Sequence, residues 1–416
     1  SIIPAIPPIP GTKITQPTNQ DLEEIFSPKK DGWLKIGNLL RNKKIEAKIN
    51  LDRIVSRHLG ILAMTGMGKS NLVSLITKKI SEVKGTVIIF DYHNDYTTLN
   101  IPNVNVIDAK INPRLLEADQ FSEVLEIREN ADVQQRVLRM SFTQEVKEAG
   151  EFWNKLEYEV DLLVNSEDKK LKEIRTSAYR VQDIIEDAQR RFDDILDPEI
   201  GNPMDYIKEG CTNIINISEL SEKQANVAMG FYLQQLLKDR KNATIAKHGK
   251  SKKQKDYKFF EPVFIILEEA HVFIPKDHDT AAKYWAAKIA REGRKFGVGL
   301  GIVSQRPRSV DLNILSQMGS FAIMKIIQED DQRQIASATE STSRELISQL
   351  TSLNVGDAVL VGQWTNLPSM VHVEEVKEKK MGADQSATKA WIKADKMKNV
   401  GVESTQGLVQ KDLLLD

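Results

Sequence analysis

The chain has 416 residues, of which 41% are hydrophobic and 28% charged, and its formal net charge is −1. This composition is typical of a soluble globular protein, and the near-zero charge means that any nucleic-acid site would have to be a local basic patch. No apolar run reaches the roughly 18 to 20 residues needed to cross a bilayer, and no signal peptide is visible. The single cysteine, Cys211, excludes an internal disulfide. We therefore expect a cytoplasmic protein that does not enter the membrane.

The first part of the chain predicts a linker followed by short elements. Residues 1–20 contain five of the fourteen prolines and predict an extended linker or arm, before which we expect a further domain or a partner surface. Residues 21–57 combine a short helix, "NQDLEEIF", with the strand-like pieces "GWLKIGNLL" and "IEAKINL".

Strands and helices alternate from residue 58 onward. "LGILAM" predicts a strand, "GKSNLVSLITKKISEV" a helix that starts on a glycine loop, "GTVIIFD" a buried strand and "VNVIDA" another strand. This rhythm is typical of an α/β fold with a mostly parallel sheet.

The alternation stops at residues 113–198, which predict an inserted helical domain. From Arg114 to Asp197 there is no proline, and Gly150 is the only glycine. Apolar residues recur at helical spacing among charged ones, which favours several antiparallel helices. One long coiled coil is the alternative, but the period breaks near "EAGEFW" and "NSED".

The alternation then returns and continues to about residue 375. The predicted strands are "CTNIINIS", "VFIILEEAHVFI", "VGLGIVSQRP", "FAIMKI" and "DAVLVG", and the predicted helices are "EKQANVAMGFYLQQLLKDRKNA" and "AAKYWAAKIAREGRKFG". We therefore assign residues 21–112 and 199–375 to one core domain and residues 376–416 to a C-terminal extension.

The stretch "HLGILAMTGMGKSNLV", residues 58–73, resembles the phosphate-binding loop pattern G-x-x-x-x-G-K-[ST]. Gly68, Lys69 and Ser70 match its last three positions, whereas Ala63 replaces the first glycine. Backbone N–H groups would hold the phosphates of ATP, Lys69 would reach the β and γ oxygens, and Ser70 would bind Mg²⁺. The residues expected to contact the nucleotide are Thr65, Gly66, Met67, Gly68, Lys69, Ser70 and Asn71.

Such a site needs an acidic partner at the end of an apolar strand, and "FIILEEAH" provides two glutamates. We expect Glu268 to hold Mg²⁺ through water, although an aspartate is more usual there, and Glu269 to be the general base that activates the attacking water. The alternative is that the two glutamates only mark a strand end that is exposed to solvent.

Two further polar residues follow other strands. Gln305 in "IVSQRP" is a candidate sensor of the γ-phosphate and the attacking water, or else an ordinary strand-end glutamine. Asp91 in "DYHNDY" is a candidate for the surroundings of Mg²⁺, or else a turn cap.

The helix end "AREGRKFG" offers Arg291 and Arg294. An arginine supplied by a neighbouring subunit stabilises the charge of a phosphoryl-transfer transition state. If one of these two acts in this way, the active form is an oligomer whose head-to-tail contacts close into a ring. The alternative is that they only compensate the helix dipole.

Taken together, "LAMTGMGKSN", "FDYHNDY", "IILEEAH", "REGRKFGVGLGIVSQRP" and "LNVGDAVLVG" resemble the HerA-type hexameric DNA translocases of the HerA–FtsK branch of RecA-like P-loop ATPases. The likeness covers about residues 20–110 and 205–375, and the helical insertion and Pro-rich start also resemble parts of this family. The family's functional positions correspond here to Lys69, Ser70, Glu269 and Gln305, with Arg294 as the trans arginine and Arg291 as a second candidate.

The resemblance implies a homo-hexamer that uses ATP and Mg²⁺ to drive double-stranded DNA through its channel. It also implies a NurA-type nuclease as partner in the resection of DNA ends for recombinational repair in archaea. The basic loop "KHGKSKKQK" is a candidate DNA contact by composition alone, since such charge runs are often only solvated. Two alternatives remain open: a DNA-pumping ATPase of a conjugation or packaging system, and a nucleotide-gated scaffold for a nuclease.

Overall fold

The computed structural model describes residues 11, 13, 15–128, 130–193, 195–247, 257–339 and 344–378. All of them belong to one compact unit. The basic loop around 248–256, the C-terminal extension beyond 378 and most of the Pro-rich arm lie outside the described residues.

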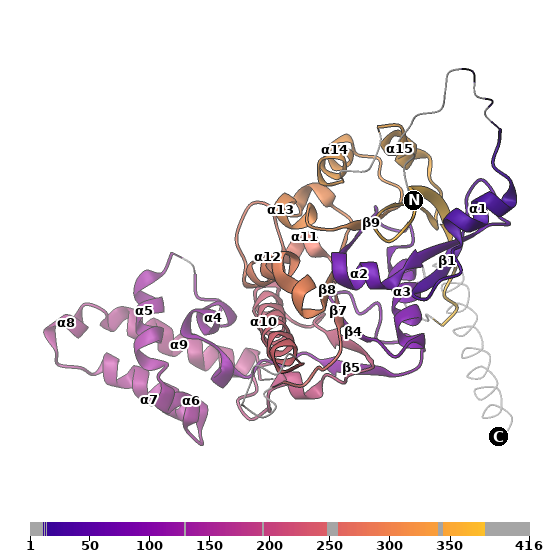
Figure 1. Cartoon of the computed structure of the whole chain (residues 1–416). Helices are drawn as coiled ribbons and strands as arrows, with labels where there is room; N and C mark the ends of the chain where they lie inside the picture. The colour runs from indigo at the N-terminus through magenta and orange to yellow at the C-terminus, as the bar shows by residue number, and fades with distance from the viewer. Residues whose placement is uncertain are drawn as a thin grey trace, which may run out of the picture. The chain divides into compact units, whose positions relative to one another are not determined.

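The core is an eleven-stranded sheet with the order β2-β1-β11-β10-β9-β3-β8-β7-β4-β6-β5 (Figure 1). The strands from β9 to β5 run parallel, and the other four extend one edge in antiparallel pairs. The prediction of a mostly parallel α/β fold is confirmed. The strands are β1 Trp33–Leu39, β2 Glu46–Asn50, β3 Leu59–Leu62, β4 Thr86–Asp91, β5 Val104–Asp108, β6 Thr212–Asn216, β7 Val263–Leu267, β8 Val298–Ser304, β9 Ser320–Ile323, β10 Asp357–Gly362 and β11 Ser369–Val373.

Strand β7 shows why its sequence is apolar at consecutive positions. Val263, Ile265 and Leu267 belong to the hydrophobic core on one face of the sheet, whereas Phe264 and Ile266 belong to the core on the other face. A central strand of a parallel sheet is covered on both faces, so every side chain must be apolar.

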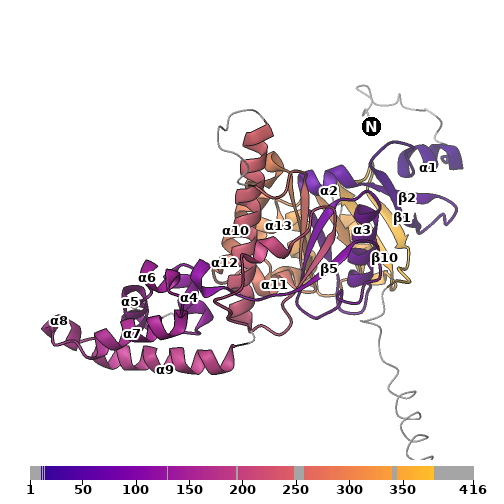
Figure 2. The same ribbon diagram turned by 90° about the horizontal axis from the view of Figure 1, so that it is seen from below.

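Helices cover the two faces of the sheet separately (Figure 2). Helices α2 (Leu51–Arg57) and α3 (Lys69–Glu82) contribute to one core, and α10 (Glu222–Lys247) and α12 (Ala281–Glu292) to the other. Helices α10 and α12 approach closely at Gly230, where an added Cβ would lie only 2.8 Å from the Ala281 Cβ.

The chain between β5 and β6 is helical and lies beside α10 (Figures 1 and 2). In it, α7 packs against α9 through apolar side chains spaced three or four residues apart. The helices are α4 Ala118–Val124, α5 Asp132–Ser141, α6 Gln144–Glu148, α7 Phe152–Val164, α8 Lys169–Lys172 and α9 Arg175–Arg191. The remaining α-helices are α1 Asn19–Phe26, α11 Ala270–Phe273, α13 Leu312–Leu315, α14 Glu329–Ala338 and α15 Arg344–Ser348.

Strand β11 and helices α13, α14 and α15 were not predicted from the sequence, and two other features also differ from the expectation. The predicted strand "VFIILEEAHVFI" ends at Leu267, because the backbone turns at Glu269, whose φ is +46°, and continues as α11. Helix α2 was not predicted; Asn50 caps it by accepting a hydrogen bond from the Arg53 N–H at 3.1 Å. Within the described part of the chain, no helix is long and apolar enough to span a membrane.

Candidate active site

The glycine loop lies at the carboxyl end of β3 and leads directly into α3. Gly66 and Gly68 have φ values of +78° and +103°, a left-handed backbone that glycine adopts without steric cost. Ala63 does not share this conformation; it is buried, and its N–H donates to the Ser304 carbonyl at 3.2 Å. An alanine therefore fits where the pattern has its first glycine.

Backbone contacts from two distant segments support the loop. The Met64 N–H donates to the Lys325 carbonyl at 3.1 Å, and the Gly356 N–H donates to the Met67 carbonyl at 3.1 Å. Thr65 donates its hydroxyl to Gln305 Oε1 at the end of β8, so the structure brings the candidate sensor glutamine against the loop.

The side chain of Asn71 is used within the chain itself. Its Nδ2 donates to the Glu374 carbonyl at 2.9 Å, and its Oδ1 accepts from the Val376 N–H at 2.8 Å. The side-chain amide therefore binds the segment after β11 to α3. Asn71 can then contact a nucleotide only through its backbone.

Glu269 is almost fully buried at 5% exposure, and one of its carboxylate oxygens, Oε2, has no hydrogen-bond partner among the described residues. His93 Nε2 lies 3.4 Å from Oε1, and His271 Nδ1 lies 3.2 Å from Oε2 but outside hydrogen-bonding geometry. Burial, together with the charges of Arg306 and Lys69, lowers the pKa of His271 to about 4, so this ring is neutral near pH 7. The contact with Glu269 is therefore not an ion pair, and the carboxylate retains an oxygen able to accept a proton.

Glu268 has a different environment. The hydroxyl of the fully buried Tyr96 donates to Glu268 Oε1. Burial raises the pKa of Glu268 to about 7, with a smaller upward contribution from Glu269 and a downward one from Lys69. The two adjacent glutamates thus have different contacts: Glu268 accepts a hydrogen bond from a tyrosine, whereas Glu269 lies beside two histidines.

The loop after β4 carries two aspartates with separate tasks. Asp91, which is fully buried, accepts from the backbone N–H groups of Asp95 and Tyr96 at 2.9 and 2.8 Å. This geometry favours the turn-capping alternative for Asp91. Asp95 instead accepts the hydroxyl hydrogen of Ser70 at 2.9 Å.

These groups suit a magnesium nucleotide. The hydroxyl of Ser70, the carboxylates of Asp95 and Glu268, and phosphate oxygens are the hard oxygen ligands that Mg²⁺ prefers. The start of the fourteen-residue helix α3 presents backbone N–H groups and a positive dipole end to an anion. When bound, the ion would neutralise charge on the phosphates, while Glu269 would accept the proton of the attacking water.

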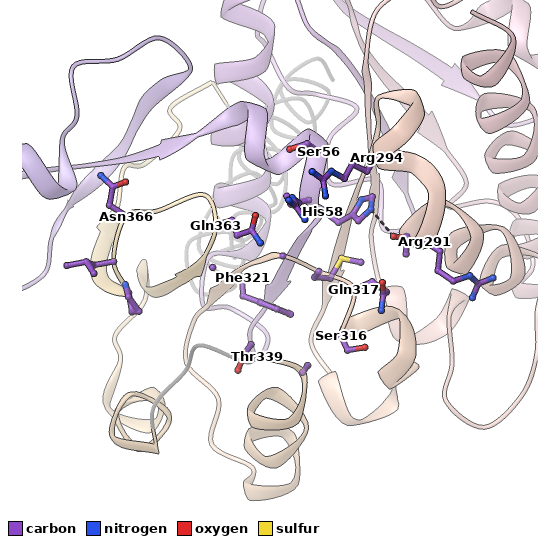
Figure 3. Close-up of a pocket in the computed structure, with 18 residues that line it drawn as sticks. Ser56, His58, Arg291, Arg294, Ser316, Gln317, Phe321, Thr339, Gln363 and Asn366 are labelled. Atoms are coloured by element: carbon purple, nitrogen blue, oxygen red, sulfur yellow. Dashed lines mark hydrogen bonds between the residues drawn. The ribbon is translucent and has the colours of Figure 1, made fainter. Parts of the chain in front are cut away.

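Arg291 and Arg294 do not join this group. They line a cavity of about 610 Å³ together with His58 and Gly319, the residues just before β3 and β9 (Figure 3). The cavity therefore lies at the amino ends of the parallel strands, opposite the glycine loop. A third arginine, Arg57, also lines it, and no carboxylate does among the described residues.

Sequence reasoning missed several residues that the structure places at the site. Asp95 and Tyr96 belong to the same "DYHNDY" stretch as Asp91, and their only signal was their position soon after a strand end. His271 follows Glu269 closely, but a lone histidine is weak evidence in a sequence.

Comparisons with known proteins were made for the whole chain. Residues 34–236 match the family model described as "Helicase HerA, central domain". The chain is 37% identical over 406 residues to the DNA double-strand break repair helicase HerA of Sulfolobus acidocaldarius, covering 94% of this chain and 78% of the relative. It is 39% identical, with the same coverage, to the protein of that name from Sulfurisphaera tokodaii.

Solved structures with the same fold are more distant in sequence. VirB4 of Thermoanaerobacter pseudethanolicus matches with a TM-score of 0.60 at 14% identity, covering 84% of this chain and 98% of that one. The plasmid coupling protein TrwB in complex with a non-hydrolysable ATP analogue matches with a TM-score of 0.56 at 11% identity, covering 84% and 91%. These likenesses show a shared fold.

Proposed function

This chain belongs to the HerA helicase family, and from that premise we propose that it is the motor part of a hexameric ring that hydrolyses ATP to drive double-stranded DNA through its channel. Its relatives are named as DNA double-strand break repair helicases. The core of residues 21–112 and 199–375 is the ATPase domain of this proposal, and residues 113–198 are its helical insertion.

The observation that carries the proposal is the division of the catalytic groups between opposite edges of the sheet. Lys69 and Glu269 lie beyond the carboxyl ends of β3 and β7, whereas Arg291 and Arg294 line a cavity at the amino ends. Strand β8, with seven residues, separates these edges by roughly 20 Å at about 3.3 Å per residue. An arginine side chain cannot cover that distance within one chain.

A second copy of the chain resolves this separation. If the arginine-lined edge of one subunit faces the glycine loop of the next, each nucleotide lies between a loop and a guanidinium from different chains. Such a contact joins two different surfaces, and repeated by rotation it closes into a ring. The excess of positive charge around the cavity suits the γ-phosphate of a neighbour's ATP.

The chemistry within one pocket follows from the residues present. Lys69 holds the phosphate oxygens, Ser70 positions Mg²⁺, and Glu269 takes the proton from the attacking water. Gln305, hydrogen-bonded to Thr65 of the glycine loop, is the proposed sensor of the γ-phosphate. Arg294, with Arg291 as a second candidate, stabilises the transition-state charge from the next subunit.

The DNA-processing role is proposed from the family. Double-strand break repair requires resection of DNA ends, for which a motor that moves duplex DNA must deliver it to a nuclease, here one of NurA type. The basic loop around residues 248–256 is a candidate for DNA contact.

ATP hydrolysis by the purified chain, with and without double-stranded DNA and at low and high salt, tests the proposal. We expect DNA to stimulate turnover at low salt and less at high salt. Binding to DNA phosphates releases counterions, so the affinity for DNA falls as the salt concentration rises. Lys69→Ala is the control without turnover. Stimulation at neither salt concentration would contradict a DNA motor and favour a nucleotide-gated scaffold.

A further inference from the structure

The contact between Ser70 and Asp95 brings a carboxylate from another loop into the nucleotide site. Ser70 Oγ donates to Asp95 Oδ2 at 2.9 Å, and Asp95 belongs to the segment after β4. The backbone N–H of Asp95 donates to the fully buried Asp91 at 2.9 Å. The carboxylate is therefore held beside the first turn of α3 by a fixed backbone.

Glu268, the acidic residue at the end of β7, does not make this contact. Its Oε1 accepts the hydroxyl hydrogen of Tyr96, a residue buried beneath the same loop. Tyr96 directly follows Asp95 in the chain, so its contact with Glu268 and the contact of Asp95 with Ser70 bring these groups close together. Glu268 therefore supports Tyr96, and Asp95 is the carboxylate in hydrogen-bond contact with the hydroxyl of the glycine loop.

We propose that Asp95, rather than Glu268, is the carboxylate that positions Mg²⁺ and its water shell next to Ser70 when ATP is bound. The inference rests on the proposed function, because it concerns the metal that accompanies ATP. Carboxylate and hydroxyl oxygens at hydrogen-bond distance from one another are suited to neighbouring positions around one Mg²⁺. Asp95 is a positioning residue in this account: it acts on the phosphates through the metal.

The test separates metal binding from nucleotide binding. Binding of a fluorescent, non-hydrolysable ATP analogue is measured at increasing Mg²⁺, starting from chelator, for the parent chain and Asp95→Asn. The Mg²⁺ concentration for half-maximal tightening is expected to rise about tenfold or more in Asp95→Asn, as for other groups that orient a metal site. Affinity without Mg²⁺ is expected to stay at the parent value, because the phosphate contacts of the loop remain.

Control variants define the outcome further. Asp108→Asn removes the same charge at the end of β5, a parallel strand separated from β4 by β6, where Asp108 accepts from Asn216 Nδ2 at 3.0 Å. This variant is expected to leave the Mg²⁺ requirement unchanged. Asp95→Glu retains a carboxylate and is expected to need less Mg²⁺ than Asp95→Asn. Ser70→Ala combined with Asp95→Asn is expected to add less than the sum of the two single effects, because both groups act on one ion.

An unchanged Mg²⁺ requirement in Asp95→Asn would overturn the inference. So would loss of nucleotide binding in the absence of Mg²⁺, which would assign Asp95 to the architecture of the loop, or an Asp95→Glu variant no better than Asp95→Asn. Failure of the parent chain to bind the analogue under any condition would instead refute the proposed function.

Discussion

Among single residues, Glu269 combines a left-handed backbone with a buried carboxylate. Its φ of +46° is a left-handed conformation, which costs a residue other than glycine on the order of 1–3 kcal/mol. Its carboxylate is buried, with one oxygen lacking a hydrogen-bond partner among the described residues. Strain and an unpaired buried oxygen in one residue are destabilising, and the proposed role in proton transfer would account for the unpaired oxygen.

Replacing this carboxylate by its amide isolates the proton transfer. Glu269→Gln is expected to bind ATP like the parent chain and to lose about 10² to 10⁴ in turnover, the usual contribution of a general base. Binding of a fluorescent nucleotide and steady-state hydrolysis provide the measurements. Glu219→Gln, an exposed glutamate beyond β6, is the control. Turnover near the parent rate would remove Glu269 from its proposed role.

His58 makes stability depend on pH. Its Nδ1 accepts from the Leu300 N–H at 3.0 Å, its Nε2 donates to the Ala290 carbonyl at 3.1 Å, and burial lowers its pKa to about 4. Between about pH 6.5 and pH 4, the histidine of the unfolded chain, with a pKa of about 6.5, binds a proton, whereas the buried ring of the folded chain stays neutral. The stability due to the neutral ring is therefore complete above about pH 6.5 and is lost as the pH falls toward about 4.

The prediction concerns the difference between the parent chain and His58→Gln. Between about pH 7.5 and pH 5, the midpoint of thermal unfolding should fall less in His58→Gln, which has no proton to bind at this position. His271, whose pKa is also lowered to about 4, is present in both proteins and cancels in the comparison. Equal pH dependence in the two would show that His58 does not contribute this effect.

Much of the candidate site can be predicted from sequence for a simple reason. Lys69, Glu269 and Gln305 each lie at or just beyond the carboxyl end of a predicted parallel strand, and these ends lie along one edge of a sheet. Asp95 and Tyr96 could not be placed in this way, because the turn capped by Asp91 decides where they lie.

At the level of elements, strands β1 to β10 were predicted, whereas strand β11 and helices α2, α11, α13, α14 and α15 were not. The apolar run of β7 identified a central strand, but its end depended on the turn at Glu269, which has no apolar signal. Helical spacing predicted helices within residues 113–198, but it did not show that Ala178 of α9 is buried whereas the adjacent Tyr179 is exposed. The spacing fixes the period of a helix, and packing decides which face is covered.

The segment after β11 is coupled to α3 through Asn71. Asn71→Ala removes one exposed and one partly buried hydrogen bond and leaves the Val376 N–H without its partner, so we expect a loss of about 1–3 kcal/mol in the free energy of unfolding. Thermal or denaturant unfolding measures this loss, and Asn42→Ala, whose amide bonds to Asn19 at the surface, is the control. A change in nucleotide affinity without any loss of stability would instead assign the Asn71 side chain to the nucleotide.

At the scale of the whole molecule, the sheet separates the two groups of residues that the proposed function assigns to one catalytic centre. The glycine loop and Glu269 lie at one edge, and the arginines lie at the other. The common direction of the parallel strands fixes this separation, because the glycine loop and Glu269 follow strands whereas the arginines precede β8. Under the proposed function, a chain built in this way has a complete site only beside another copy of itself.

Mixing two inactive variants tests this claim most directly. Lys69→Ala lacks the loop lysine and Arg294→Ala lacks the arginine, so rings of either variant alone are expected not to hydrolyse ATP. In an equal mixture, about one interface in four joins an intact loop to an intact arginine of the next subunit, and ATP hydrolysis should return in part. If mixed rings form, as shown by co-purification of differently tagged variants, yet hydrolyse no ATP at any ratio, the arginine does not act across the interface and the account is contradicted.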